Sequence, residues 1–216
     1  MNIKIKHKAS FAESVSDEIK QALVTSASAP SPKGKLFVFT GPSGAGKSTL
    51  AQVILREFDF FKKVVTCTTR AMREGERADI DQHFISRDQF EEHIAKDELF
   101  EYATVYGNYY GSLKKEVYEI MDSGKSVLFV VDVQGALAIK QKYPSAIDVF
   151  IKTPSLSVLK KRLIKRGTDE MSVIEQRMKT AKDELKLESK FSHIIVNDDL
   201  KLAIKEVQKL VVDSLK

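Results

Sequence analysis

The segment from Gly41 to Ser48, GPSGAGKS, holds the residues whose types and spacing point most directly to chemistry. It has the form G-x-x-x-x-G-K-S, in which glycines let backbone N–H groups approach phosphate oxygens without interference from a Cβ atom. Lys47 adds a positive charge for the outer phosphates, and the Ser48 hydroxyl is a ligand suited to Mg²⁺. The sequence therefore predicts a P-loop that binds nucleotide phosphates.

The residues on either side predict the strand and the helix that such a loop requires. Leu36 to Phe39 is a run of four apolar residues, as expected of a buried strand, and Ser48 to Phe58 has the pattern of a helix. The N-terminus of that helix carries a partial positive charge and points at the phosphates. A chance match in a glycine-rich turn would lack these flanks.

Further along the chain, strand-like segments alternate with helical ones. This order predicts an α/β fold with a parallel sheet covered by helices on both faces. The expected strands are 64–69, 99–105, 126–132, 146–152 and 192–196, with a strand-and-turn segment, YGNYYGS, at 106–112. The expected helices are 87–97, 113–121, 134–142, 156–165, 173–188 and 200–215.

The composition narrows the class of protein. A chain of 216 residues with 43% hydrophobic residues can bury the core of one α/β domain. The formal charge of +5 suits anionic small molecules as well as nucleic acids. A single cysteine, Cys67, fits a reducing compartment. Because no apolar run approaches roughly 18 residues and no apolar segment follows Met1, we expect a cytoplasmic protein without a secretory signal.

Residues 1–34 are expected to form an extension that precedes the main domain. Ser10 to Val24 repeats apolar side chains at helical spacing and predicts a short amphipathic helix. Thr25 to Gly34, TSASAPSPKG, has the composition of a linker. A mobile tail, a helix resting on its own domain and a partner-docking segment are all compatible with this pattern.

Charged residues recur near the predicted carboxyl ends of strands, where ligands bind in open α/β sheets. Arg70 and Arg73, in TTRAMREGE, can grip one phosphate from two sides, although a solvated pair has the same spacing. Asp132 ends an apolar strand. It can hold Mg²⁺ or a ligand, cap the helix that starts at Gln134, or do both.

Two other features have a functional and a purely structural interpretation. Arg166 and Arg177 flank a Gly-Thr-Asp break in a charged helical region, which is typical of a mobile lid over phosphates and also of an exposed helical hairpin. Glu101 lies in the apolar run LFEYATV, either in a site or facing solvent. The four histidines lack metal-ligand spacing, so we expect them to be structural or at the surface.

These residues together resemble the guanylate kinase family. The matching pieces follow one another from Lys35 onward. They are GPSGAGKST, TTRAMREGE, FEYATVYGNYYGS, the strand ending in Asp132 with Gln134-Gly135 after it, KRLIKRGTDE and IIVNDDL. Among P-loop kinases, the YGNYYGS and VNDDL elements are specific to this family.

The resemblance implies transfer of the γ-phosphoryl group of ATP to GMP, and to dGMP, with Mg²⁺ and with ADP and GDP as products. It implies that residues 35–216 form one kinase domain. Within it the resemblance places a core of 35–69, 113–160 and 190–216, a small mixed-β GMP-binding region of 70–112, and a helical lid of about 161–189.

The resemblance also assigns residues by position. For ATP they are Gly41, Pro42, Ser43, Gly44, Ala45, Gly46, Lys47, Ser48, Thr49 and Asn197, the last beside adenine. For GMP they are Thr66, Arg70, Arg73, Gln82, Glu101, Tyr110, Gly111, Ser112 and Asp132. The residues implied in catalysis are Lys47, Arg70, Arg73, Arg166 and Arg177, and those implied in Mg²⁺ binding are Ser48 and Asp132.

The chemistry of these residues fits the implied reaction. The phosphate of GMP is largely dianionic at neutral pH, so no protein base is needed to activate it. Catalysis then depends on alignment and charge neutralisation. The Glu101 carboxylate can accept from the N1–H and 2-amino groups of guanine, and adenine lacks both donors. Such polar matching can reject an analogue by about 10⁴-fold or more.

Three positions, in two regions of the chain, depart from the family pattern. Gln82 replaces a tyrosine whose hydroxyl usually touches the GMP phosphate, and Asp79 replaces a glycine in the same loop. We therefore expect weaker GMP binding than is usual in the family. Val130 stands where an acidic residue is common, two positions before Asp132, which removes one water-mediated contact to Mg²⁺.

Two alternative functions are compatible with parts of this pattern. One is a non-catalytic guanylate-kinase-like module that binds a partner peptide, but the intact Gly46, Lys47 and Ser48 disfavour it. The other is a P-loop kinase for another nucleotide or a phosphorylated sugar, and Glu101 with Ser112 argues for guanine instead. The expected partners are ATP and GMP, with neither nucleic acid nor a membrane, and the sequence leaves monomer and homo-oligomer open.

Overall fold

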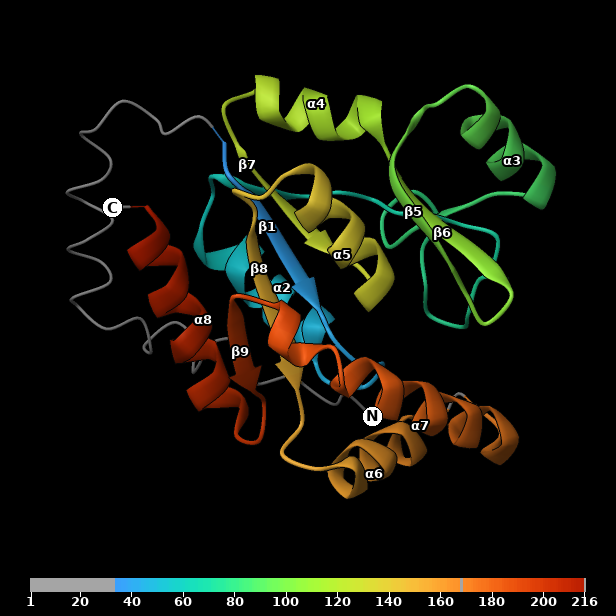
Figure 1. The fold of residues 1–216 in the computed structure, drawn as a ribbon, viewed down its shortest axis with the longest axis vertical. Coiled ribbons are helices and arrows are strands. Elements are labelled where there is room, and N and C mark those ends of the chain that lie inside the picture. Colours follow the sequence, from blue (N-terminus) through green and yellow to red (C-terminus); the bar gives the residue numbers. More distant parts are fainter. Residues whose placement is uncertain (1–33, 168, 216) are drawn as a thin grey trace, which may run out of the picture.

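A computed structural model describes residues 34–167 and 169–215, which form two sheets with helices packed against them (Figure 1). The helix expected at 10–24 and nearly all of the linker expected at 25–34 lie outside the described residues. Within the described part, no helix combines the length and the apolar character that a membrane span requires.

The main sheet has five strands in the order β2-β7-β1-β8-β9, and every neighbouring pair is parallel. The central strand β1 (Leu36–Thr40) is buried along its whole length, because helices cover both of its faces. The other strands are β2 (Phe61–Lys63), β7 (Ser126–Val130), β8 (Ile147–Lys152) and β9 (His193–Val196).

Alternate side chains of β1 supply two separate cores. Phe37 and Phe39 pack on one face with α2 (Lys47–Glu57) and α8 (Leu200–Ser214). On the other face, Leu36 and Val38 pack with apolar residues of two further helices. These helices are α4 (Lys114–Asp122) and α5 (Val133–Lys142). The α/β fold predicted from the sequence is confirmed, and the loop after β1 emerges between the two layers (Figure 1).

The second sheet has four strands in the order β4-β3-β6-β5 and mixes parallel with antiparallel pairs. The strands are β3 (Cys67–Thr68), β4 (His83–Phe84), β5 (Leu99–Val105) and β6 (Asn108–Leu113). Helix α3 (Arg87–Ala95) packs on it through the fully buried Phe90. Because β3 belongs to this sheet, the sheet begins before residue 70, where the sequence places the start of the GMP-binding region.

A helical hairpin stands beside the loop that follows β1 (Figure 1). Its helices are α6 (Leu156–Arg166) and α7 (Met171–Leu185), and a single turn of 3₁₀ helix, Glu188–Lys190, follows. The hydroxyl of Ser155 caps α6, and Gly167 ends it with a φ of 67°. Leu159, Leu163, Ile174 and Ala181 form a small core between the two helices. The hairpin therefore has its own packing and matches the region expected to act as a lid.

One strand predicted from the sequence is wrong. Residues 64–69 were expected to form a strand of the main sheet, but the edge strand of that sheet is Phe61–Lys63. Cys67–Thr68 pairs in the second sheet instead. The segment VVTCTT consists of residues that favour strands, and within a few residues the chain leaves the main sheet and enters the second one.

The joint between β8 and the segment before β9 contains a buried carboxylate. Asp148 is 1% exposed. Its carboxylate accepts hydrogen bonds from the backbone N–H and the hydroxyl of Ser192, and it forms an ion pair with Lys140 at 3.0 Å. We predict that Asp148→Ala lowers the free energy of unfolding by about 3 kcal/mol, since it removes the acceptor of the Ser192 backbone N–H and the carboxylate partner of Lys140.

Urea denaturation measures this loss. The matched control is Asp122→Ala, at an exposed position at the end of α4, which should change stability by less than about 0.5 kcal/mol. Equal effects of the two substitutions would show that the buried carboxylate does not anchor this joint.

Candidate active site

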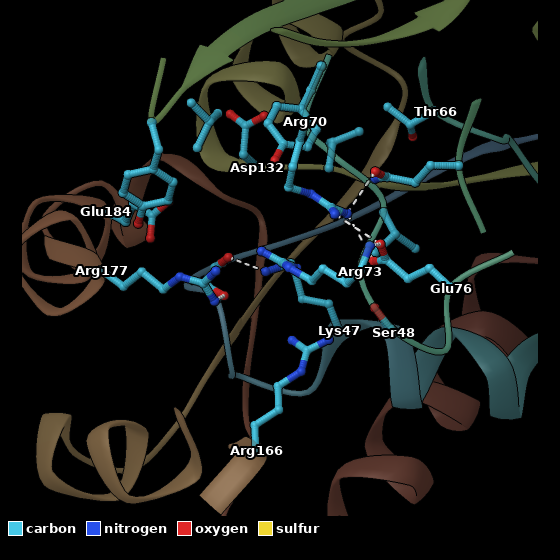
Figure 2. Close-up of a pocket in the computed structure, with 18 of the residues that line it drawn as sticks. Lys47, Ser48, Thr66, Arg70, Arg73, Glu76, Asp132, Arg166, Arg177 and Glu184 are labelled. Atoms are coloured by element: carbon cyan, nitrogen blue, oxygen red, sulfur yellow. Dashed lines mark hydrogen bonds and ion pairs between the residues drawn. The ribbon is translucent and has the colours of Figure 1, made fainter. Parts of the chain in front are cut away.

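The carboxyl ends of β1 and β7, the second sheet and α7 converge on one pocket (Figure 2). Its walls are mostly polar and charged, and residues from all three parts of the predicted site contribute. The residues that line it are Gly41, Ser43, Lys47, Ser48, Thr66, Arg70, Arg73, Glu76, Gln82, Glu101, Val105, Tyr106, Tyr110, Val130, Val131, Asp132, Arg166, Arg177 and Glu184.

The P-loop holds the lysine ammonium against its own carbonyls. Lys47 Nζ donates to the carbonyl oxygens of Gly41 at 2.6 Å and Pro42 at 3.0 Å. Gly41 has a φ of 125°, and a Cβ there would lie 2.0 Å from the Ile151 carbonyl oxygen, so only glycine fits. Burial lowers the pKa of Lys47, although Glu184 and Asp132 act in the opposite direction. A desolvated cation at this place favours the binding of an anion.

Asn197 supports the P-loop from beneath. Its side chain is 3% exposed and its Nδ2 donates to the Ala45 carbonyl at 2.8 Å. A Cβ on Gly46, whose φ is 101°, would lie 2.1 Å from the same nitrogen. Nδ2 of Asn197 is therefore committed to the loop, and the contact with adenine expected from the sequence stays a prediction.

A second opening lies on the far side of the loop. It is lined by residues of the P-loop and of α6. They are Ser43, Gly44, Gly46, Lys47, Ser48, Thr49, Arg162, Leu163 and Arg166. Four residues line both the pocket and this second opening, namely Ser43, Lys47, Ser48 and Arg166. The P-loop therefore borders both spaces.

Arg70 and Arg73 lie together in the pocket, and a carboxylate holds the first of them. Glu76 forms a two-bond ion pair with the Arg70 guanidinium, with both N–O distances at 2.9 Å, and also accepts from the Arg73 backbone N–H at 2.8 Å. Gln82 accepts from Arg70 at 3.2 Å. Burial, Arg70 and other nearby arginines lower the pKa of Arg73. Two guanidinium groups in the same pocket favour the binding of an anion such as a phosphate.

The unusual Asp79 is accommodated by a local contact. It adopts a φ of 61°, the left-handed conformation in which glycine is the usual residue. Its carboxylate bonds Nδ1 of His83 at 2.8 Å, and Nε2 of the same ring bonds Glu116. These contacts tie the arginine-bearing loop to α4. No group of three or more His, Cys, Asp or Glu side chains in the described chain is arranged to hold a metal ion.

Helix α7 brings Arg177 to the P-loop. The side chain is 7% exposed, donates to the Ser43 hydroxyl at 3.3 Å and pairs with Asp169 at 2.9 Å. Its Nε is buried without a hydrogen-bond partner among the described residues. A buried donor in this state is costly unless a ligand accepts from it. Arg166, from the end of α6, points into the same space (Figure 2).

The pocket also contains a buried carboxyl group, that of Glu101. Glu101 is 6% exposed and accepts from the Ser112 hydroxyl at 2.7 Å. Burial raises the pKa of the Glu101 carboxyl to about 7, and Asp132 adds to the effect. A Cβ on Gly135 would lie 2.7 Å from Glu101 Oε2, so the glycine after Gln134 leaves room for this carboxyl. Thr66 and Tyr110 also line the pocket, whereas Gly111 is packed inside the sheet.

Asp132 caps α5 and also faces the pocket. Its Oδ1 accepts from the backbone N–H groups of Gln134 at 2.8 Å and Gly135 at 3.1 Å, which confirms the predicted cap. Ser48 lines the same pocket. Val130, the last residue of β7, also lines it. One carboxylate and one hydroxyl suit Mg²⁺, which keeps several waters and binds substrate phosphates in place of an all-protein cage.

Five pocket residues were not identified from the sequence, and three of them, Glu76, Tyr106 and Glu184, have polar side chains. Glu76 stands within the quoted motif TTRAMREGE, where its spacing of three from Arg73 was the available signal. Tyr106 lies at the tip of the β5–β6 hairpin and Glu184 near the end of α7. Nothing in the sequence indicates that the tip of the β5–β6 hairpin and helix α7 meet. Tyr106 and Glu184 could therefore not be predicted as pocket residues from the sequence.

Comparisons with known proteins agree on one family. The sequence model described as guanylate kinase matches residues 33–214. A guanylate kinase of Carboxydothermus hydrogenoformans is 43% identical over 179 residues, which is 83% of this chain and 88% of the relative. A guanylate kinase of Clostridium tetani is 42% identical over 179 residues, which is 83% of this chain and 86% of that relative.

A solved structure agrees with these sequence relatives. The crystal structure of guanylate kinase from Anaplasma phagocytophilum superposes with a TM-score of 0.70 at 28% identity, covering 85% of this chain and 87% of that one. The similarity therefore extends over the main sheet, the second sheet and the helical hairpin together. The chain belongs to the guanylate kinase family.

Proposed function

We propose that this chain transfers the γ-phosphoryl group of ATP to GMP, giving ADP and GDP. The observation that carries the proposal is a single pocket that is lined by the P-loop lysine, by several arginines and by the buried Glu101. An anionic group fits the cations, and a hydrogen-bond-donating base fits the carboxylate. The alternative of a non-catalytic binding module is not favoured, because the phosphate loop is intact.

Glu101 reads the guanine base in this proposal. Its carboxylate accepts from N1–H and the 2-amino group, and Ser112 holds it in position through a hydrogen bond of 2.7 Å. Thr66 and Asp132 line the same end of the pocket. Adenine would leave a buried carboxylate without donors, which is the costly outcome that gives a site its specificity.

Arg70 and Arg73 hold the phosphate of GMP, with the Tyr110 hydroxyl beside Arg70. Glu76 orients the Arg70 guanidinium before the substrate arrives, through the two bonds of 2.9 Å. Its carboxylate also neutralises part of the charge that the two arginines concentrate. Because the GMP phosphate is already largely dianionic, its oxygen attacks without a general base.

Lys47, Arg166 and Arg177 surround the phosphoryl group in transfer. They stabilise charge on its oxygens, and their fixed positions align the two nucleotides end to end. Arg177 reaches the Ser43 hydroxyl from α7, so the helical hairpin contacts the P-loop directly. Asn197 and Gly46 keep the loop in shape for the phosphates of ATP.

Ser48 and Asp132 are the residues that would hold Mg²⁺. When bound, the ion neutralises charge on the β- and γ-phosphate oxygens. Asp132 already accepts two backbone hydrogen bonds through Oδ1, so its orientation is fixed by the start of α5. We extend the proposal to dGMP as a second acceptor, since guanine and phosphate provide most of the recognition.

The choice of acceptor tests the proposal directly. With ATP and Mg²⁺, we expect ADP release with GMP, a partial response with IMP, which keeps N1–H but lacks the 2-amino group, and a kcat/KM at least about 10⁴-fold lower with AMP. Glu101→Gln should reduce kcat/KM for GMP and leave the KM for ATP within about twofold. A panel in which AMP or a pyrimidine nucleotide is the best acceptor would contradict the assignment.

The affinity for GMP should depend on pH through Glu101. Its pKa is raised to about 7, so the carboxyl is mostly protonated at pH 6 and loses its capacity to accept both donors of guanine. The ratio of Kd for GMP between Glu101→Gln and the unmodified protein should therefore rise about tenfold from pH 6 to pH 8. Calorimetric titration of GMP at several pH values measures it.

The ratio removes contributions that both proteins share, such as the titration of the GMP phosphate and of Glu184. A ratio that stays constant over this range would mean that Glu101 is ionised throughout or does not touch the base.

Gln82 provides a test of the phosphate end. Its Oε1 accepts from Arg70 at 3.2 Å, and a tyrosine hydroxyl at this position would reach the phosphate on a rigid ring. We predict that Gln82→Tyr lowers the KM for GMP by about tenfold with little change in the KM for ATP, as expected for one added hydrogen bond to a charged group. Gln82→Ala is the control and should not lower it. An unchanged KM in Gln82→Tyr refutes the prediction.

A further inference from the structure

Glu184 is a half-buried carboxylate of the pocket to which the proposed reaction gives no role. It projects from α7 on the side of the pocket away from Glu76 (Figure 2). No described residue donates a hydrogen bond to its side chain or forms an ion pair with it. Burial raises the pKa of the Glu184 carboxyl to about 7, with Lys47 acting in the opposite direction and Asp132 reinforcing it. Such a group lacks the donors that would stabilise its charge.

The surroundings of Glu184 connect the lid with the acceptor side of the pocket. Tyr106, at the tip of the β5–β6 hairpin, adopts a φ of 50° and lies against Thr180 and Glu184 of α7. Glu184 lines the pocket that contains Glu101 and Asp132, and it does not line the second opening beyond the P-loop. It therefore faces the acceptor nucleotide and not the nucleoside part of ATP.

The chemistry of the acceptor leaves few groups that this carboxylate can bind. The phosphate offers only acceptors and repels it, and the donors of guanine are directed at Glu101 in the proposed function. The remaining donors on a nucleoside monophosphate are the hydroxyl groups of the sugar, which connects the base end of the pocket to the phosphate end. Lys47 is a less suitable partner, because its Nζ donates to the carbonyls of Gly41 and Pro42.

We propose that Glu184 accepts a hydrogen bond from a sugar hydroxyl of the acceptor nucleotide, so that the lid helix recognises the sugar. This inference rests on the proposed function and assigns a further specificity-determining residue to the same site.

The test combines changes in the protein with changes in the substrate. kcat/KM is measured at saturating ATP and Mg²⁺ for GMP, 2′-deoxy-GMP and 3′-deoxy-GMP, with the full chain and with Glu184→Ala, Glu184→Gln and Glu175→Ala. Glu175 is an exposed carboxylate on the same helix and serves as the matched control. Thermal unfolding of each variant shows whether it is folded.

One of the two deoxy substrates should lose about tenfold or more relative to GMP with the unmodified protein and with Glu175→Ala, as expected for a hydrogen bond to a charged group. With Glu184→Ala, the same comparison should differ by less than about threefold, because the acceptor is gone. Glu184→Gln should give an intermediate ratio, and it keeps the test available if Glu184→Ala does not fold. The two substrates identify which hydroxyl is bound.

Three results would overturn the inference. The first is a GMP to deoxy-GMP ratio that Glu184→Ala leaves unchanged. The second is an equal loss with all three acceptors, which would assign Glu184 to lid closure or to Lys47. The third is a sensitivity that appears with 2′-deoxy-ATP and not with the deoxy acceptors. If the unmodified protein phosphorylates none of the three guanine nucleotides, the proposed function itself fails, which is a different result from the other three.

Discussion

The concentration of positive charge in one desolvated pocket is the constraint on which the rest of this structure depends. Lys47, Arg70, Arg73 and Arg177 all reach the same cavity, and like charges in a low-dielectric site repel one another strongly. The protein offsets this repulsion with Glu76 on Arg70, Asp169 on Arg177 and the P-loop carbonyls on Lys47. The cations are thereby kept in place while their capacity to bind phosphate is retained.

Each of these cations comes from a part of the fold with its own packing. The P-loop is fixed between β1 and α2, the arginine pair is carried by the loop between β3 and β4, and Arg177 by the helical hairpin. The site therefore exists only when the three parts lie together. Because the hairpin has its own small core, the geometry within it does not depend on the other two parts.

Local sequence signals predicted what depends on neighbours in the chain. The P-loop glycines, the strand LFVFT and the Asp132 cap each follow from residues a few positions apart, and all are found as expected. Asn197 and Ala45 are 152 positions apart, so their contact had no local signal. The strand predicted at 64–69 was assigned to the wrong sheet for a similar reason. A run of strand-forming residues does not indicate which of two sheets it will join.

Glu76 and Glu184 illustrate two uses of acidic residues in a cationic pocket. Glu76 is paired in the described structure and holds Arg70 in a geometry that a phosphate can share. Glu184 has no such partner among the described residues, although Lys47 is among the charges that act on it. A paired carboxylate costs little to keep buried, whereas an unpaired one is disfavoured until a donor arrives. The first therefore shapes the empty site, and the second contributes only when a ligand supplies what it lacks.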